Sequence, residues 1–420
     1  MNTEALYDTI IVGSGVAGLY TGIELLKRYP KSRVGIFEKH KELGGRAHTF
    51  HQTVDGKELQ WEAGAGRIST HHEMILNLLK RYKLTFSPIG GGLQYKDSYT
   101  SDLEQDRFQT GIPAFIDVLA GLPQEDLQMN TIRQLLTRIH GAKITDAYLI
   151  RFPYRAEVDI MRADMALKLF AREFRKEEEY GICVEGLSAL VDAMRDDVKK
   201  RGGTIHTQHT LLSVEEEDVV TAIFEHDSEE VRIRGHQAVL AIPSEGLKNI
   251  KPFAKWNVLK HLKMQPLLRF YGAFPKEDGK VWYEQYGGRI VTSEPLRYII
   301  PGSASIGSVH MSYTDSQDAT YWIEKLKTKG EKEVGEEMLA ELRKLLRPSI
   351  PPPYFVKAHA WEQGVTYWLP GNYDPAELSK KALRPFESMP NIHVCGESFS
   401  VRQGWMEGAV EHAAMLLKKL

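Results

Sequence analysis

Cysteine is the scarcest residue in this chain of 420 residues. Only Cys183 and Cys395 occur, and more than two hundred residues separate them. This spacing excludes a disulfide framework and a cysteine-based zinc site, and it is compatible with a reducing compartment. Both cysteines lie in apolar sequence, which predicts buried structural thiols. We predict no metal site.

The sequence also lacks long apolar runs and an excess of charge of one sign. No run of eighteen apolar residues occurs, which argues against a membrane partner. Lys and Arg number 54 against 56 for Asp and Glu, so nothing favours a nucleic acid partner. Residues 1–13 contain no basic segment followed by a cleavable apolar stretch, so we expect a cytoplasmic protein. A hydrophobic content of 42% allows a sizeable core.

A glycine-rich turn carries the strongest positive signal. Residues 8–12 are apolar and β-branched, which predicts a buried strand, and a helical apolar pattern begins after residue 18. Between them lies the sequence G-S-G-V-A-G. In a dinucleotide fold Gly13 permits the tight turn, Gly15 lets the backbone approach a pyrophosphate, and Gly18 lets the helix pack closely. The N-terminus of that helix offers free N–H groups to phosphates.

Glu38 is the second part of this signal. Residues 33–37 predict the next strand of a βαβ unit, and Glu38 stands at its end, twenty residues past Gly18. A carboxylate there can accept hydrogen bonds from both ribose hydroxyls of an adenosine. The pattern predicts an α/β, Rossmann-type dinucleotide site, for which NAD and FAD are both candidates.

The residues after Glu38 favour FAD. Residues 39–46 read K-H-K-E-L-G-G-R, and here the sequence resembles the flavin amine oxidase superfamily, which includes monoamine oxidases and L-amino acid oxidases. In that family a Gly-Gly-Arg turn lies along the FAD diphosphate, and Gly44, Gly45 and Arg46 match it. Arginine suits this role because its planar fork grips phosphate oxygens in a bidentate way.

The C-terminal residues resemble the closing FAD motif of the same family. Residues 391–395 predict a strand that leads into Glu397, and residues 403–409 open a final helix. The resemblance implies that Glu397 contacts ribityl or diphosphate oxygens. It also implies that the helix N-terminus, at Trp405 and Met406, directs its positive dipole end at the flavin pyrimidine ring.

A third matching block begins at residue 186, and in it the resemblance implies that Leu211 contacts the adenine through its backbone. The implied architecture is a Rossmann-type FAD-binding domain assembled from three segments, with an α+β substrate-binding domain. We expect residues 1–78, 180–258 and 357–420 to form the FAD domain. We expect residues 79–179 and 259–356 to form the substrate domain.

We expect the FAD to be bound non-covalently. Monoamine oxidases attach their flavin to a cysteine at a position that falls near Gln363, and this sequence has no cysteine there. The residues expected to bind FAD are Gly13, Ser14, Gly15, Ala17, Gly18, Glu38, Gly45, Arg46, Gly66, Arg67, Leu211, Glu397, Trp405 and Met406.

Arg67 is the sharpest clue to the substrate. Residues 62–68 read E-A-G-A-G-R-I and resemble a stretch of L-amino acid oxidases whose arginine holds the substrate carboxylate. A bidentate guanidinium would fix the α-carbon over the flavin. Residues 312–315, S-Y-T-D, resemble a second, shorter stretch of the same oxidases. The alternative is that Arg67 binds only the cofactor.

Trp405 and Trp368 are candidate aromatic walls of the substrate site. The resemblance places Trp405 beside the flavin and the second wall within residues 364–371, where Gly364 takes the wall position and Tyr367 lies nearby. Such walls position a neutral amine and exclude water. For all three aromatic residues, packing in the core is the alternative.

Arg269 marks a departure from the family. Most members carry a lysine that holds a water near the flavin, and the matching stretch here, residues 265–271, offers Arg269. Arginine keeps the charge and can donate hydrogen bonds to water, but it cannot act as a base. This departure leaves fast reaction with O2 in question.

Together these features predict a flavin-dependent oxidase that removes hydride from a C–H bond next to nitrogen, with O2 reduced to H2O2. An L-amino acid is the favoured substrate, and a primary amine or polyamine is the second choice. A desaturase, a porphyrinogen-type oxidase and an FAD-binding protein without turnover stay open, as does a homodimer. The predicted catalytic residues are Arg67, Trp405, Arg269 and Trp368.

Overall fold

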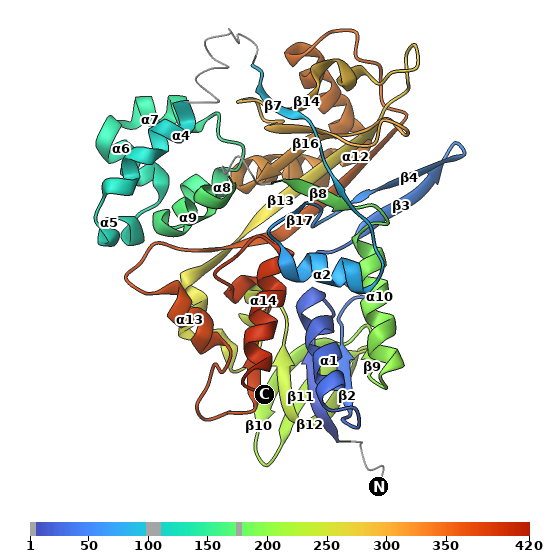
Figure 1. Cartoon of the computed structure of the whole chain (residues 1–420), viewed down its shortest axis with the longest axis vertical. Coiled ribbons are helices and arrows are strands. Elements are labelled where there is room, and N and C mark those ends of the chain that lie inside the picture. The colour runs from blue at the N-terminus through green and yellow to red at the C-terminus, as the bar shows by residue number, and fades with distance from the viewer. Residues whose placement is uncertain (1–5, 98–110, 174–178) are drawn as a thin grey trace.

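Two large sheets dominate the molecule and lie one above the other along its long axis (Figure 1). The computed structural model describes residues 6–97, 111–173 and 179–420. The lower, mostly parallel sheet is built around the first strand of the chain, and the final helix packs beside it. The upper, mostly antiparallel sheet has a group of helices at its side.

The apolar run at the start of the chain becomes the centre of the first sheet. Ile10 lies opposite Gly35 on one neighbouring strand and Ala238 on the other, and both pairings are parallel. Buried parallel strands are apolar on both faces, which is why these runs show no polar alternation. The strands, in spatial order, are β10 (Thr210–Glu216), β11 (Val220–His226), β12 (Glu229–Leu240), β1 (Tyr7–Val12), β2 (Val34–Phe37) and β9 (Thr204–His206), with β18 (Ile392–Val394) parallel to β12.

Three helices from distant parts of the sequence pack side by side against this sheet (Figure 1). Helix α1 (Val16–Arg28) contacts both α10 (Leu187–Lys200) and α14 (Met406–Leu417). Apolar side chains of all three helices share one buried cluster. The predicted Rossmann-type architecture is therefore confirmed.

The second sheet is covered by one long helix, α12 (Ser316–Leu345), which packs on its strands and breaks at Gly330. Within the sheet, β13 and β17 run antiparallel, and their register shifts at a bulge between Gln265 and Leu267. The strands, in spatial order, are β17 (Phe355–Trp368), β13 (Leu262–Ala273), β16 (Ser308–Asp315), β15 (Tyr298–Pro301), β14 (Gly288–Val291) and β7 (Gly92–Tyr95).

Shorter elements surround the two sheets. Helices α4 to α9 form the group at the side of the second sheet (Figure 1). Their bounds are α4 (Ile112–Asp117), α5 (Gln124–Met129), α6 (Ile132–His140), α7 (Ala142–Leu149), α8 (Arg155–Asp159) and α9 (Ala163–Glu173). The others are α11 (Ser244–Leu247), α13 (Pro375–Ala382), the hairpin β3 (Thr49–Val54) and β4 (Lys57–Glu62), and the 3₁₀ helices η2 (Val118–Gly121), η3 (Phe253–Lys255), η4 (Asn257–His261), η5 (Trp282–Tyr286) and η6 (Glu397–Phe399).

A small third sheet joins the two parts. Strand β8 (Tyr180–Cys183) pairs antiparallel with β5 (Ile68–Ser69) and with β6 (Phe86–Pro88). In this register Ser69 lies opposite Tyr180. The residues around position 67 are thereby held next to residues more than a hundred positions away.

The domain division proposed from the sequence stays a prediction, and two strands cross its boundaries: β17, and β6 through its pairing with β8. β17 belongs to the second sheet and extends to Trp368, so residues 357–368 lie with the elements assigned to the substrate domain. The strand begins before the boundary proposed at residue 357 and continues past it, because its pairing with β13 covers nearly its whole length.

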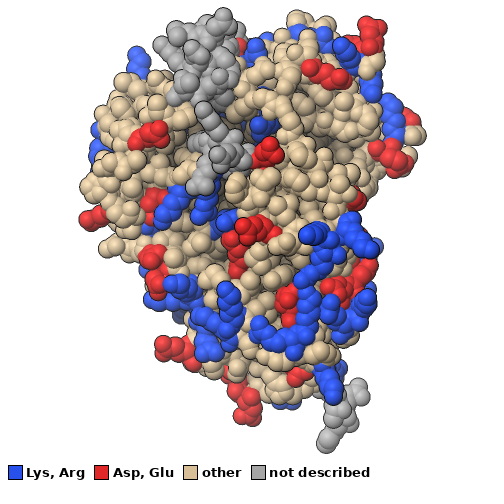
Figure 2. Space-filling view, in the orientation of Figure 1, with Lys and Arg blue, Asp and Glu red and all other residues tan. Residues whose placement is uncertain are grey.

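The surface and the cysteines have the character expected from the composition. Figure 2 shows Lys and Arg side chains interspersed with Asp and Glu on the face in view.

Both cysteines are buried free thiols, and burial raises the pKa of Cys183 and of Cys395 to about 12. Among the described residues, no helix combines the length and the apolar character needed to cross a membrane.

Helix α2 (Glu73–Arg81) is capped by a residue from the other end of the chain. His72, at its N-cap, makes no side-chain cap. Instead the carboxylate of Glu407, which is only 2% exposed, accepts the backbone N–H groups of Met74 and Ile75 at 2.9 Å each. A carboxylate at a helix N-terminus also interacts favourably with the helix dipole.

We expect Glu407→Ala to lower the free energy of unfolding by about 1–3 kcal/mol, because two N–H groups lose a charged acceptor. Glu73→Ala is the matched control: it removes an exposed carboxylate from the same helical turn and should change stability by less than about 0.5 kcal/mol. Urea denaturation of both variants measures the difference. Equal losses would contradict the capping role.

Candidate functional site

The glycine-rich turn has the geometry that a phosphate needs. Gly13 has a φ of 99°, and a Cβ there would lie 2.6 Å from the carbonyl oxygen of Ala241. A Cβ on Gly18 would lie 2.0 Å from the carbonyl oxygen of Gly13, so only glycine lets α1 begin this close to β1. A Cβ on Gly15 would meet nothing closer than the Gly44 carbonyl oxygen, at 4.0 Å. The backbone at Gly15 is therefore open to a ligand.

Glu38 lies at the carboxyl end of β2 and closes onto this turn. One carboxylate oxygen accepts the backbone N–H of Ser14 at 2.9 Å and its hydroxyl at 2.8 Å, and the other accepts the N–H of His40 at 3.0 Å. These bonds fix the buried carboxylate. His209 donates its N–H to the carbonyl oxygen of Glu38, which brings Leu211, at the start of β10, towards the same end of the sheet.

Arg46 and Glu397, predicted from opposite ends of the chain, form an ion pair. Nη2 of Arg46 lies 3.0 Å from a carboxylate oxygen of Glu397, and Nη1 donates to the carbonyl oxygen of Gly364 at 2.8 Å. The turn before Arg46 is joined to the glycine-rich turn, because Gly44 donates its N–H to the carbonyl oxygen of Ser14 at 3.1 Å. The first and last sequence motifs thus share one site.

These residues fit a dinucleotide cofactor. Gly45 has a φ of 58°, and a Cβ there would lie 3.8 Å from the Cα of Gly15. The two turns therefore lie close together, and at this point no side chain stands between their backbones. Helix α1 has no side-chain cap and no acidic residue in its first turn, which leaves its N–H groups and positive dipole end for a phosphate. Ala17 is buried behind that turn and fixes its packing.

Arg67 lies among aromatic rings. Its Nη2 donates to the hydroxyl of Tyr154 at 2.6 Å. Its Cζ lies 5.2 Å from the ring centroid of Tyr180, 5.8 Å from that of Tyr154 and 5.9 Å from that of Trp405. The rings of Tyr180 and Trp405 stack with centroids 5.9 Å apart and planes 17° apart. Such cation–π contacts favour the charged guanidinium and limit its movement.

Arg269 reaches the same region from β13. Its Nη1 donates to the carbonyl oxygen of Glu62 at 3.2 Å, and its Cζ lies 4.9 Å from the ring centroid of Tyr313. A Cβ on Gly66 would lie 2.8 Å from Nη1, so the glycine beside Arg67 makes room for this side chain. Arg269 is 6% exposed, and its buried Nε has no acceptor among the described residues. A buried donor of this kind is typical of a ligand or water site.

Burial shifts the pKa values of the titratable groups around Arg269. Burial, and then the charges of Arg269 and Arg67, hold the pKa of His310 well below its usual value, so this imidazole is neutral at pH 7. Glu62 interacts with Arg269, yet burial raises its pKa to about 7. Near neutral pH the carboxylate therefore offsets only part of one guanidinium charge.

Most of the predicted residues come together in two groups. The glycine-rich turn, Glu38, Arg46 and Glu397 form one group. Gly66, Arg67, Arg269, Trp405 and Met406 form the other, where Trp405 is the N-cap of α14 and Met406 its first residue. Sequence analysis missed Tyr154 and Tyr180, and only Tyr313 carried a signal, in the stretch at residues 312–315.

Trp368 does not join either group. Its side chain is fully buried, and its indole N–H donates to the carbonyl oxygen of Ser400 at 3.0 Å. Its backbone N–H donates to the side chain of Gln403. Tyr367 is buried as well. This placement favours core packing for the two aromatic residues, the alternative that the sequence left open. Tyr180 is the ring that stacks on Trp405, and the wall position of Gly364 stays a prediction.

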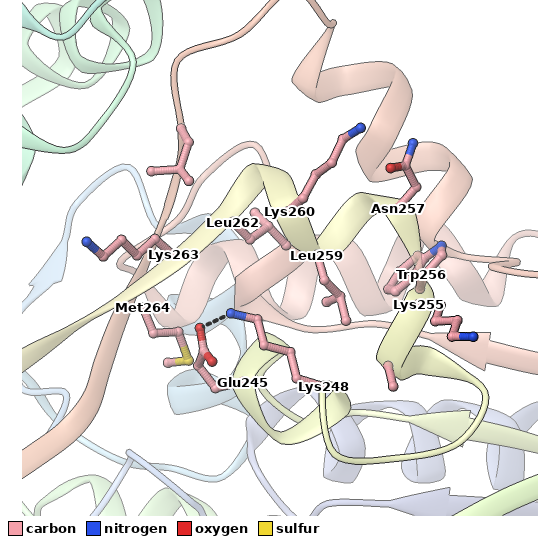
Figure 3. A pocket seen from close by; sticks show the side chains of 12 residues that line it. Glu245, Lys248, Lys255, Trp256, Asn257, Leu259, Lys260, Leu262, Lys263 and Met264 are labelled. Atoms are coloured by element: carbon pink, nitrogen blue, oxygen red, sulfur yellow. Dashed lines mark hydrogen bonds and ion pairs between the residues drawn. The ribbon is translucent and has the colours of Figure 1, made fainter.

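A separate hollow of about 680 Å³ lies near the start of β13 (Figure 3). Exposed lysines line it, and one of them, Lys248, pairs with Glu245 at 2.6 Å. Its lining contains none of the predicted site residues, so it is distinct from the site described above. The lysines are Lys248, Lys255, Lys260 and Lys263.

Sequence comparisons match the chain to one protein family and to curated oxidases. The family described as flavin-containing amine oxidoreductases matches residues 16–415. The YobN protein of Bacillus subtilis, provisionally named an L-amino-acid oxidase, is 22% identical over 96% of this chain and 92% of its own length. The flavin-dependent L-tryptophan oxidase RebO of Lentzea aerocolonigenes is 24% identical over 98% of this chain and 97% of its own length.

Comparison with solved structures shows the same fold. Putrescine oxidase bound to putrescine superposes with a TM-score of 0.76 at 15% sequence identity, and the match covers 99% of both chains. A variant of the same enzyme gives 0.76 at 17% identity, also over 99% of both chains. At these identities the likeness concerns the fold alone.

We expect the stability of the protein to depend on pH through Glu62. Its pKa is about 7 in the folded chain, against an ordinary value of 4.5, so the folded state binds more protons between these pH values. The free energy of unfolding should therefore fall as pH rises from about 4.5 to about 7, by at most about 1.4 kcal/mol per pH unit from this group.

Urea denaturation across pH 5 to about 8 tests this expectation. Glu62→Gln should lose this component of the pH profile, since the amide does not titrate. Glu58→Gln removes an exposed carboxylate from the same strand and should leave the profile unchanged. Coincident profiles for the parent and Glu62→Gln would show that Glu62 titrates normally.

Proposed function

The chain belongs to the family of flavin-containing amine oxidoreductases, and we propose that it is an FAD-dependent oxidase of L-amino acids. The observation that carries the proposal is the position of Arg67, held by Tyr154 and three aromatic rings beside the N-terminus of α14. A fixed guanidinium with a planar fork suits a carboxylate.

The charge of the region supports a substrate that carries a carboxylate. Arg67 and Arg269 lie on either side of Gly66, His310 is neutral, and Glu62 is only partly ionised at neutral pH. A substrate carboxylate would accept hydrogen bonds from a guanidinium in this region. A simple amine would bring a further positive charge, or would have to bind in its neutral form.

The residues of the chain would bind and orient the substrate rather than act as a base. Arg67 would hold the carboxylate, and the stacked rings of Tyr180 and Trp405 would form an apolar wall that excludes water. A bound flavin supplies the acceptor for the hydride that leaves the α-carbon. No protein base is needed at that carbon if the amine binds neutral. The imine product then hydrolyses to the keto acid and ammonia.

We propose FAD as the flavin because the site has an adenosine end as well as a diphosphate turn. Glu38, oriented by Ser14 and His40, lies where a ribose would be held, and Gly13, Gly15 and Gly18 form the turn. Arg46 and the N-terminus of α14 would contact its remaining parts. Binding should be non-covalent, because both cysteines are buried thiols with a raised pKa.

A primary amine or polyamine is the second candidate substrate. Arg67 already donates to Tyr154 and contacts three rings, so it has protein partners without a carboxylate. The family as a whole acts on small amines with O2. Because Arg269 stands in place of the family's lysine and cannot act as a base, we expect a slow reaction with O2.

Denaturation tests the attachment of the cofactor. We expect acid or heat to release intact FAD into the supernatant and to leave a colourless pellet, because the chain offers no reactive thiol to hold it. Mass spectrometry of the supernatant separates FAD from FMN. A yellow pellet would contradict non-covalent binding.

Substitution of Arg67 decides between amino acid and amine. Arg67→Ala should lower kcat/KM for an L-amino acid by about 150- to 5,000-fold, which corresponds to a loss of about 3–5 kcal/mol in transition-state stabilisation. The reason is that the substrate carboxylate loses its partner in the site. Arg67→Lys should recover only part of the loss, since an ammonium cannot form the bidentate fork.

The matched amine without a carboxylate is the control for this experiment. It should be a poor substrate of the parent protein and should lose little more in Arg67→Ala, while the flavin content stays unchanged. If the variant loses equally on both substrates, or the parent prefers the amine, Arg67 serves the flavin and the amine is the better assignment.

A further inference from the structure

The carboxylate of Asp315 accepts hydrogen bonds from a helix other than its own. It ends β16 and is the N-cap residue of α12, where an aspartate usually accepts N–H groups of its own helix. Its side chain makes no such cap. Instead one oxygen accepts the backbone N–H of Arg155 at 2.9 Å and the other that of Ala156 at 3.0 Å, across to α8. The carboxylate is 3% exposed.

Those two N–H groups belong to the residues that directly follow Tyr154. Tyr154 is the N-cap of α8 and has no side-chain cap of its own, so Asp315 supplies acceptors for the first turn. The hydroxyl of Tyr154 accepts the hydrogen bond from Arg67. Its ring meets those of Tyr298 and Tyr313 edge to face, with centroids 5.9 Å apart in each pair.

We propose that Asp315 is a positioning residue for the substrate carboxylate: it fixes the backbone after Tyr154, and Tyr154 in turn aims the guanidinium of Arg67. The inference rests on the proposed function, because it requires Arg67 to bind the carboxylate. In this role Asp315 does not touch the substrate and acts through Tyr154 and Arg67.

The surroundings of Asp315 make this contact sensitive to charge. Asp318 on α12 and Arg297 before β15 interact with Asp315, and Asp315 interacts with Tyr367 on β17. From α8, Arg155 and Asp159 interact with Asp318, and Glu157 interacts with Tyr367. Arg297 pairs with Asp318 at 3.3 Å. Burial raises the pKa of Asp315 to about 6, so its charge is present at pH 8 and largely lost at pH 5.

The sign of the pH effect follows from that loss of charge. A protonated Asp315 is a weaker acceptor for two N–H groups than the carboxylate is, since hydrogen bonds to an ionised acceptor are about twice as strong. The KM for an L-amino acid should therefore rise as pH falls through about 6, in addition to any change shared with an amine substrate.

The test compares Asp315→Asn with the parent holoenzyme on an L-amino acid and on the matched amine. The amide can accept only one of the two N–H groups, so we expect KM for the amino acid to rise about tenfold, the loss expected for one charge-assisted bond. KM for the amine should change less than twofold. Asp318→Asn is the matched control, since it removes a neighbouring carboxylate to which the N–H groups of Arg155 and Ala156 do not donate, and it should leave both KM values within twofold.

Tyr154→Phe gives a second readout that does not need Asp315→Asn to fold. It removes only the hydroxyl that Arg67 contacts, so KM for the amino acid should rise and its step near pH 6 should vanish. A step that persists in Tyr154→Phe overturns the proposal. So does an equal loss on both substrates in Asp315→Asn, or strict additivity of the two substitutions in the double variant.

The variants separate the role of Asp315 from the role of Arg67. If Arg67→Ala harms the amino acid and the amine equally, the assignment of the carboxylate to Arg67 fails. If Arg67→Ala is selective for the amino acid and neither Asp315→Asn nor Tyr154→Phe is, only the role of Asp315 fails.

Discussion

The parallel pairing of β1 with β2 and β12 is the constraint on which the site depends. It brings the carboxyl ends of strands from distant parts of the sequence to one edge of the sheet, where a parallel fold places its ligands. Three hydrogen bonds continue the pairing just past the strand ends: Gly13 to Phe37, Ala241 to Val12 and Cys395 to Leu240. The glycine turn, Glu38 and Glu397 therefore lie at one edge of the sheet, although Glu397 is far from the other two in the sequence.

The glycine-rich turn and Glu38 could be predicted because their signals are local. A tight turn needs glycine at residue 13, a close helix needs glycine at residue 18, and the acidic residue follows a strand at a fixed spacing. The surroundings of Arg67 carry no such signal. Tyr180 reaches Arg67 only because β8 pairs with β5, and Tyr154 only because Asp315 holds the start of α8. Both contacts depend on tertiary structure.

The placement of Trp368 shows a second limit of sequence spacing. The pairing of β17 with β13 is irregular before this residue, because β17 advances four residues, from Trp361 to Val365, while β13 advances two, from Leu267 back to Gln265. Gly364 lies beside that shift, and a Cβ on it would lie 2.5 Å from the Cβ of Leu267. The count from the terminal Pro-Gly predicted Gly364 at the wall, and that stays a prediction. The sequence around Trp368 carries no signal that separates a wall residue from a core residue.

Arg67 and Arg269 lie in one partly buried region, where a guanidinium charge needs stabilisation. Aromatic rings provide part of it, since Arg67 and Arg269 both lie close to them, and rings attract a cation without neutralising it. Burial weakens the nearby acids at the same time, because it raises the pKa of Glu62 to about 7. The aromatic contacts therefore favour the charged form of both guanidinium groups, while burial favours the protonated form of the nearby acid.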